Sequence, residues 1–185
     1  MTSRLAVGFF GICASSAFAQ TVNFNNNILP SPPDRLVRFY NGPVVGQNYT
    51  AVLLYGTSDS SLTAHPQTAL FRVPTTASPG TWSGGTRTLT GMPSTPGTVV
   101  RLQMAMFDNT QFANYAAALA GGGVIGRSII FDYTIPSQPP APGSDSMVNF
   151  VGFTVPEPSA IALGLIGAGA LFMLRRRKYV ASAIQ

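Results

Sequence analysis

Cysteine is almost absent from this sequence. The one cysteine in 185 residues, Cys13, lies in an N-terminal apolar segment that we expect to be removed. The mature chain would then contain none, which excludes disulfides, a thiol nucleophile and the usual cysteine-containing zinc sites. The domain must fold on its hydrophobic core alone.

Charged residues are also scarce in the middle of the chain. Residues 20–154 contain no Lys and no Glu, and six Arg against five Asp give a net charge of +1. Most of the formal charge of +5 for the whole chain comes from cations at its two ends. There is therefore no electrostatic basis for nucleic-acid binding.

The same region is rich in Thr, Ser, Gly, Asn and Pro, with aromatic residues spread throughout. Such a composition favours strands and turns over helices. Apolar and polar residues alternate most clearly over residues 98–108, which is typical of a strand with one buried face. Residues 48–56 are also expected to form a half-buried strand, with Tyr49, Ala51, Leu53 and Tyr55 on one face. The predicted strands cover residues 21–26, 35–40, 48–56, 68–74, 86–91, 98–108, 127–135 and 147–155.

One segment, residues 108–123, has helical spacing instead. Asp108 or Asn109 is expected to cap this short helix and Gly121 to end it. Its apolar face would be formed by Phe112, Tyr115, Ala116 and Leu119. About eight strands without long helices between them predict a mainly β fold. We expect a single antiparallel β-sandwich of jelly-roll or Greek-key type over residues 20–154.

The N-terminus has the organisation of a secretory signal peptide over residues 1–19. Arg4 precedes an apolar stretch at residues 5–14, and Ala17 and Ala19 supply the small residues that signal peptidase requires. Cleavage is expected before Gln20, after transport by the export machinery.

The C-terminal region has three parts in order. A motif at residues 155–159 precedes fifteen small or apolar residues at 160–174, and residues 179–185 follow the basic cluster at 175–178 as a cytoplasmic tail. The motif is Val155, Pro156, Glu157, Pro158 and Ser159, and the cluster is Arg175, Arg176, Arg177 and Lys178. As a transmembrane helix, residues 160–174 would span about 22 Å, short of a bilayer core of about 30 Å. The cations predict that this end stays in the cytoplasm.

These three parts resemble a PEP-CTERM sorting signal over residues 155–178. The resemblance implies a Gram-negative bacterium in which an exosortase, a membrane protease, recognises the motif and detaches the protein from the inner membrane. It also implies a final location at the cell surface or outside the cell, in association with extracellular polysaccharide or biofilm.

No catalytic, metal or cofactor site is predicted. Residues 121–126 fit G-x-G-x-x-G but are expected to end a helix, and the one histidine, His65, lies in a turn-like stretch. We therefore expect a non-enzymatic surface or matrix protein. A carbohydrate-binding module is the first alternative, with Trp82 as a candidate ligand-stacking residue, although a core position is favoured for it. An extracellular hydrolase, which would need two Asp or an Asp with His65 in one cleft, is the second.

Overall fold

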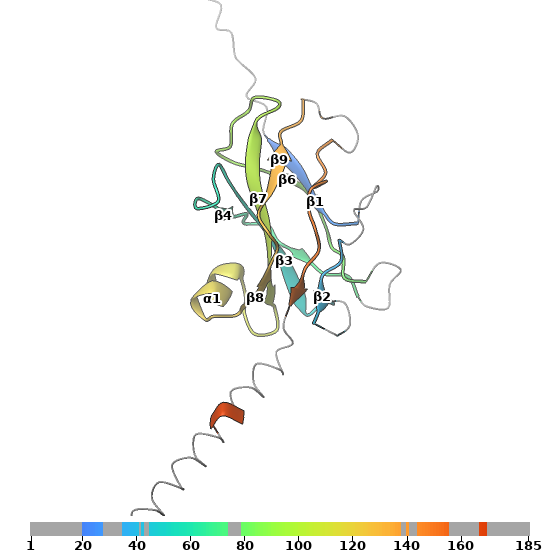
Figure 1. Ribbon diagram of the computed structural model, residues 1–185, viewed down its shortest axis with the longest axis vertical. Helices are drawn as coiled ribbons and strands as arrows, with labels where there is room; N and C mark the ends of the chain where they lie inside the picture. The colour runs from blue at the N-terminus through green and yellow to red at the C-terminus, as the bar shows by residue number, and fades with distance from the viewer. Residues whose placement is uncertain are drawn as a thin grey trace, which may run out of the picture.

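The computed structural model describes residues 20–27, 35–40, 42, 45–73, 79–137, 140, 144–155 and 167–169. Within these ranges the chain forms ten β-strands, one helix of six residues, α1, and a helical stretch at residues 167–169. Figure 1 shows the strands gathered in one body, with α1 beside it. The predicted mainly β fold is confirmed.

Two long strands form the centre of the largest sheet. β3 (Tyr49–Gly56) and β7 (Val99–Asp108) pair antiparallel over eight positions. The prediction of one buried face was wrong for β3, which is buried on both faces because a second core covers the other side of the sheet. The short strands β4 (Thr63–Ala64) and β5 (Ala69–Leu70) pair with the outer edge of β3. On the other side, β8 (Val124–Arg127) and β9 (Phe131–Thr134) pair with successive stretches of β7. The six strands are thus arranged in four rows.

The prediction of one strand over residues 127–135 was wrong in its continuity. Ser128 Oγ accepts a hydrogen bond from the backbone N–H of Met104 at 3.0 Å and donates to the carbonyl of Ile129 at 2.7 Å. A side-chain hydrogen bond therefore replaces a backbone bond of the ladder, and the strand is interrupted between β8 and β9. The sequence also missed β8 itself, because it begins only three residues after the Gly121 helix cap.

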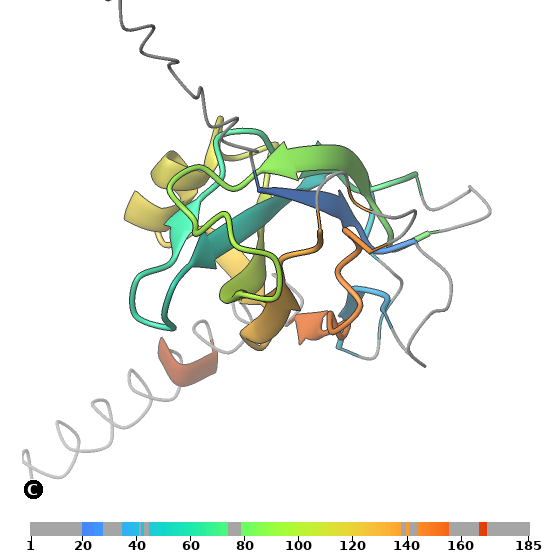
Figure 2. The ribbon, with the colours of Figure 1, turned by 90° about the horizontal axis from the view of Figure 1, so that it is seen from above.

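Four further strands form two small sheets. β1 (Thr21–Asn25) pairs antiparallel with β6 (Ser83–Thr88). β2 (Arg38–Phe39) pairs with β10 (Thr154–Val155) in parallel, whereas the sequence predicted antiparallel pairing. Seen from above, the β1–β6 pair forms a layer of its own beside β3 (Figure 2).

The main core joins these layers around Trp82. Its indole is fully buried, and its ring centroid lies 5.3–5.4 Å from those of Phe24, Phe71 and Phe150. The predicted inner face of β7 is confirmed, since four alternate side chains are fully buried in this core: Val100, Leu102, Met104 and Met106.

Asn26 fixes the approach to Trp82 and was not noticed in the sequence. Its buried side chain accepts from the backbone N–H of Trp82 at 2.8 Å and donates to the carbonyls of Arg35 and Gly80. These three backbone groups lie outside regular ladders and need other partners. The Asn26 side chain satisfies all three, and so ties the end of β1 to the segments around Arg35 and Trp82.

A second, smaller core lies on the opposite face of the large sheet, under α1 (Tyr115–Ala120). The buried residues of this core are Val52, Leu54, Ala105, Phe107 and Ala118. Gly121 ends the helix as predicted, but Asn114 is the cap in place of Asp108 or Asn109, accepting from the N–H of Ala117. Ala116 and Leu119, predicted to face the core, are both exposed, Leu119 at 53%, and Ala118 is the buried residue of the helix.

Candidate functional site at the start of the C-terminal motif

The last strand of the domain ends at the first residue of the predicted motif. Val155 is only 1% exposed and belongs to the main core. β2 holds this strand through two backbone bonds, from Arg38 N–H to Phe153 O at 3.2 Å and from Tyr40 N–H to Val155 O at 2.8 Å. Pro156 follows at once, and proline, which has no N–H donor, is typical of strand ends.

Two glycines leave the space in which β10 and the residues before it pack against the domain. A Cβ on Gly126 of β8 would overlap the Val155 side chain and would lie 2.7 Å from Phe153 Cε2. A Cβ on Gly152 would overlap the backbone of Leu36. Because any larger side chain would have to displace these neighbours, both glycines are needed for the close packing of β10.

The motif therefore starts without a linker. Residues 156–166 and 170–185 lie outside the described part, so the structure does not place Pro156 to Ser159 or Arg175 to Lys178. Gly167, Ala168 and Gly169, within the predicted transmembrane segment, are helical and exposed. Among the described residues, no helix has the length and apolar character needed to cross a bilayer.

Tyr49, which packs against Phe39 of β2, and its cross-strand neighbour Asp108 both have shifted pKa values. Burial, and then the charge of Asp108, raise the pKa of Tyr49, whose ring packs edge-on against Phe39 at 5.4 Å. Burial acts to raise the pKa of Asp108, but hydrogen bonds from Thr110 and Gln111 outweigh it and lower this pKa. Neither group is prepared to exchange a proton near pH 7.

The N-terminal prediction falls mostly outside the described residues. Ala17 and Ala19 are not described, but Gln20, the expected first residue of the mature chain, is 3% exposed. Its carbonyl accepts from the N–H of Leu89 at 2.7 Å. Gln20 is therefore part of the folded domain, and the cleavage site itself stays a prediction.

The remaining candidate residues have structural positions. The full burial of Trp82 leaves no indole face for a sugar ring, which corrects the ligand-stacking hypothesis and agrees with the favoured core position. His65 is also buried, and its Nδ1 accepts from the N–H of Gln67 within a turn. In the part of the chain that the structure describes, no three His, Cys, Asp or Glu side chains form a metal-binding group.

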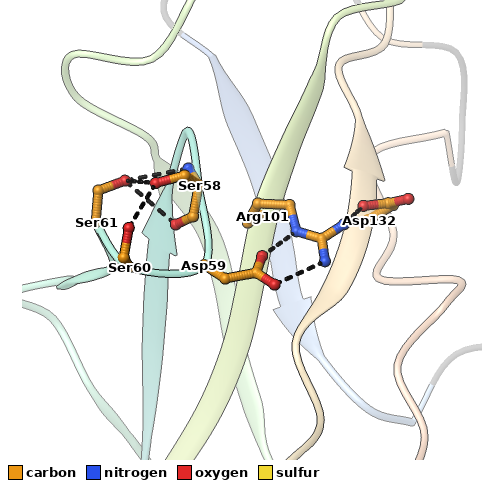
Figure 3. A network of polar contacts seen from close by, with 6 residues as sticks. All are labelled: Ser58, Asp59, Ser60, Ser61, Arg101 and Asp132. Atoms are coloured by element: carbon orange, nitrogen blue, oxygen red, sulfur yellow. Dashed lines mark hydrogen bonds and ion pairs between the residues drawn. The ribbon is translucent and has the colours of Figure 1, made fainter.

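Two aspartates converge on one arginine, an arrangement that the sequence did not reveal. Arg101 on β7 donates from Nε to Asp59 at 2.6 Å and also pairs with Asp132, its cross-strand neighbour on β9 (Figure 3). The guanidinium lies between the two carboxylates, where a hydrolase would need the scissile bond and a water. This geometry joins the β3–β4 loop to the sheet and does not resemble a catalytic pair.

A groove of about 590 Å³ lies next to this network, between the β3–β4 loop and α1. Arg127 crosses it from β8 and donates to the Tyr115 hydroxyl at 3.0 Å. Its floor and walls combine apolar and polar side chains, among them Leu54, Asp59, Leu62, Gln103, Leu119 and Ile130.

Residues 154–178 match the family model of the PEP-CTERM protein-sorting motif. The match confirms the resemblance found in the sequence and marks this chain as a PEP-CTERM protein. The motif implies export, C-terminal sorting and an exosortase as the processing partner. No curated protein and no solved structure matches the chain.

Proposed function

We propose that this is a non-enzymatic protein of the cell surface or extracellular matrix, cut by an exosortase near its Pro-Glu-Pro motif. Signal peptidase removes residues 1–19, and residues 160–174 hold the precursor in the inner membrane as a transmembrane helix. The observation that carries the proposal is the position of Val155, where a compact β-domain, which we take to be a β-sandwich, ends directly at the motif.

This position suits a sorting substrate. The fold is closed at Val155, so loss of the residues that follow leaves every described strand in place. Pro156 and Pro158 disfavour helix formation, so from the sequence we expect an extended peptide at this point. Such a peptide would be open to a protease beside a domain that does not depend on it.

Replacement of Pro156, Glu157 and Pro158 by alanine tests the proposal. The wild-type protein should leave the membrane fraction of its host, and the variant should stay there. A matched control replaces Ser94, Thr95 and Pro96, three exposed loop residues, by alanine and should behave as wild type. Equal release of all three proteins contradicts the proposal.

Saccharide binding in the α1 groove is the second candidate function. It is favoured by apolar surfaces for sugar rings beside hydrogen-bonding groups from Asp59, Gln103 and Arg127. Titration with soluble anionic and neutral polysaccharides, comparing wild type with Arg127→Ala, tests it. Exposed Ile129→Ala is the control. Binding that is absent, or that Arg127→Ala does not weaken, rejects this candidate.

A further inference from the structure

The chain leaves the domain beside two exposed side chains of very different chemistry. Arg38 and Tyr40 flank Phe39, whose ring packs against the main core. Arg38 is exposed, and Tyr40, at 67%, is more exposed than any other large hydrophobic side chain of the described residues except Ile129, which equals it. We call the surface formed by Arg38 and Tyr40 the exit face.

Backbone contacts place this face at the point of exit. In the parallel ladder Arg38 lies opposite Thr154, and Tyr40 donates to the carbonyl of Val155, the last residue before Pro156. Neither residue can move away from the exit without loss of the β2–β10 pair.

Only four residues, 156–159, separate Val155 from the apolar segment that begins at residue 160. A fully extended chain covers about 3.3–3.6 Å per residue, so the Cα atoms of Val155 and Ala160 lie at most about 18 Å apart. A membrane-inserted segment therefore keeps the exit of the domain within this distance of the bilayer. The interfacial headgroup layers add several ångströms on each side of the hydrocarbon core.

We propose that residues 156–159 act as a short tether, which holds the exit face against the lipid headgroups of the outer leaflet of the inner membrane for as long as the tail remains attached. The inference rests on the proposed function, because it requires residues 160–174 to be in the membrane. The partner is an anionic phospholipid surface. An exposed tyrosine suits the interface between water and lipid, and an arginine attracts anionic headgroups while its stem contacts apolar surface.

The other end of the domain provides an internal comparison. Gln20 and Leu89 bond to each other there, and the loop from Gly91 to Thr98 follows. Figure 1 shows this end of the body opposite the end that carries β2. Thr95, in the exposed part of this loop, should never reach the membrane.

Site-directed fluorescence tests the proposal, since the chain from Gln20 onwards contains no cysteine. Tyr40→Cys, Arg38→Cys and Thr95→Cys are made separately in the chain 20–185 and labelled with an environment-sensitive fluorophore. Each is reconstituted into vesicles of phosphatidylethanolamine and phosphatidylglycerol, with and without a lipid that carries a nitroxide on its headgroup. Flotation of the vesicles measures insertion independently.

The expected result is quenching at positions 38 and 40 and none at position 95. A flexible Gly-Ser insert between Val155 and Pro156 should reduce the quenching at both exit-face positions without changing flotation. Protein that floats with the vesicles but is not quenched at 38 or 40 overturns the inference and leaves the proposed function intact. Quenching that the insert does not reduce overturns the tether as its cause. Protein that does not float contradicts the proposed function itself.

Discussion

Tyr40 donates its backbone N–H to the carbonyl oxygen of Val155 at 2.8 Å, so an early strand of the domain holds the residue at which the sorting peptide begins. Val155 is therefore part of the fold as well as part of the signal. Because of this double role, two truncated chains that differ by only a few residues should differ in stability.

Truncation after Val155 should leave stability unchanged, and truncation after Gly152 should lower it. The shorter chain loses β10 and the Val155 side chain, whose full burial is worth about 1.5–3 kcal/mol. Urea unfolding of the two chains, both starting at Gln20, measures the difference. Equal midpoints for the two chains would show that β10 does not contribute to the domain.

Gly126→Val should destabilise the domain by about 1–3 kcal/mol, because the new side chain would overlap Val155 and Phe153. The measurement is thermal unfolding, with limited proteolysis to detect release of residues 153–155. Ile129→Ala, three residues further on and 67% exposed, is the control and should have little effect. A Gly126→Val protein as stable as wild type would contradict the packing of β10 against β8.

Trp82 is the only tryptophan, so its fluorescence reports directly on the main core. The folded protein should emit at short wavelength and resist quenching by iodide, and both properties should disappear on unfolding. Trp82→Ala should lower the free energy of unfolding by about 3–5 kcal/mol because it leaves a large cavity among three aromatic rings. Strong iodide quenching of the folded protein would contradict the burial.

Alkaline pH should destabilise the domain through Tyr133. Burial, with a smaller effect from Asp145, raises the pKa of Tyr133, and its hydroxyl donates to Thr21 O at 2.7 Å. Because the pKa is higher in the folded state, this contribution is complete below the unfolded value of about 10 and is lost as pH rises above it. Urea unfolding between pH 8 and 11 should show a steep loss in wild type and a shallower one in Tyr133→Phe. Parallel curves would contradict this role.

Local patterns predicted the parts of the fold that depend on one face of one strand. Alternation identified β7, side chains two residues apart identified one of the two buried faces of β3, and the apolar spacing placed the α1 segment and its Gly121 end. The helix cap was missed although Asn114 stands directly before Tyr115, because the apolar spacing was extended one turn too far towards the N-terminus. At the site, the motif itself was readable from sequence because its three parts are contiguous.

Features that depend on distant pairing were not predictable. The parallel β2–β10 register, the two aspartates around Arg101 and the α1 groove each bring together residues from separate strands. Ser128 interrupts a good strand pattern only because Met104 lies opposite it. The spacing of residues within one segment does not show which strand lies opposite. For this reason one continuous strand was wrongly predicted over residues 127–135, and antiparallel pairing was wrongly predicted for the last strand.

The central claim is that an exosortase removes the tail and leaves a folded domain that still contains Val155. The most direct test is the intact mass of the mature protein from a host with its exosortase and from the same host without it. We predict a chain that begins at Gln20, retains Val155 and lacks residues 160–185 in the first host, and a chain that keeps those residues in the second. A protein that keeps the tail in both hosts, or one from which Val155 has been removed, would contradict the account.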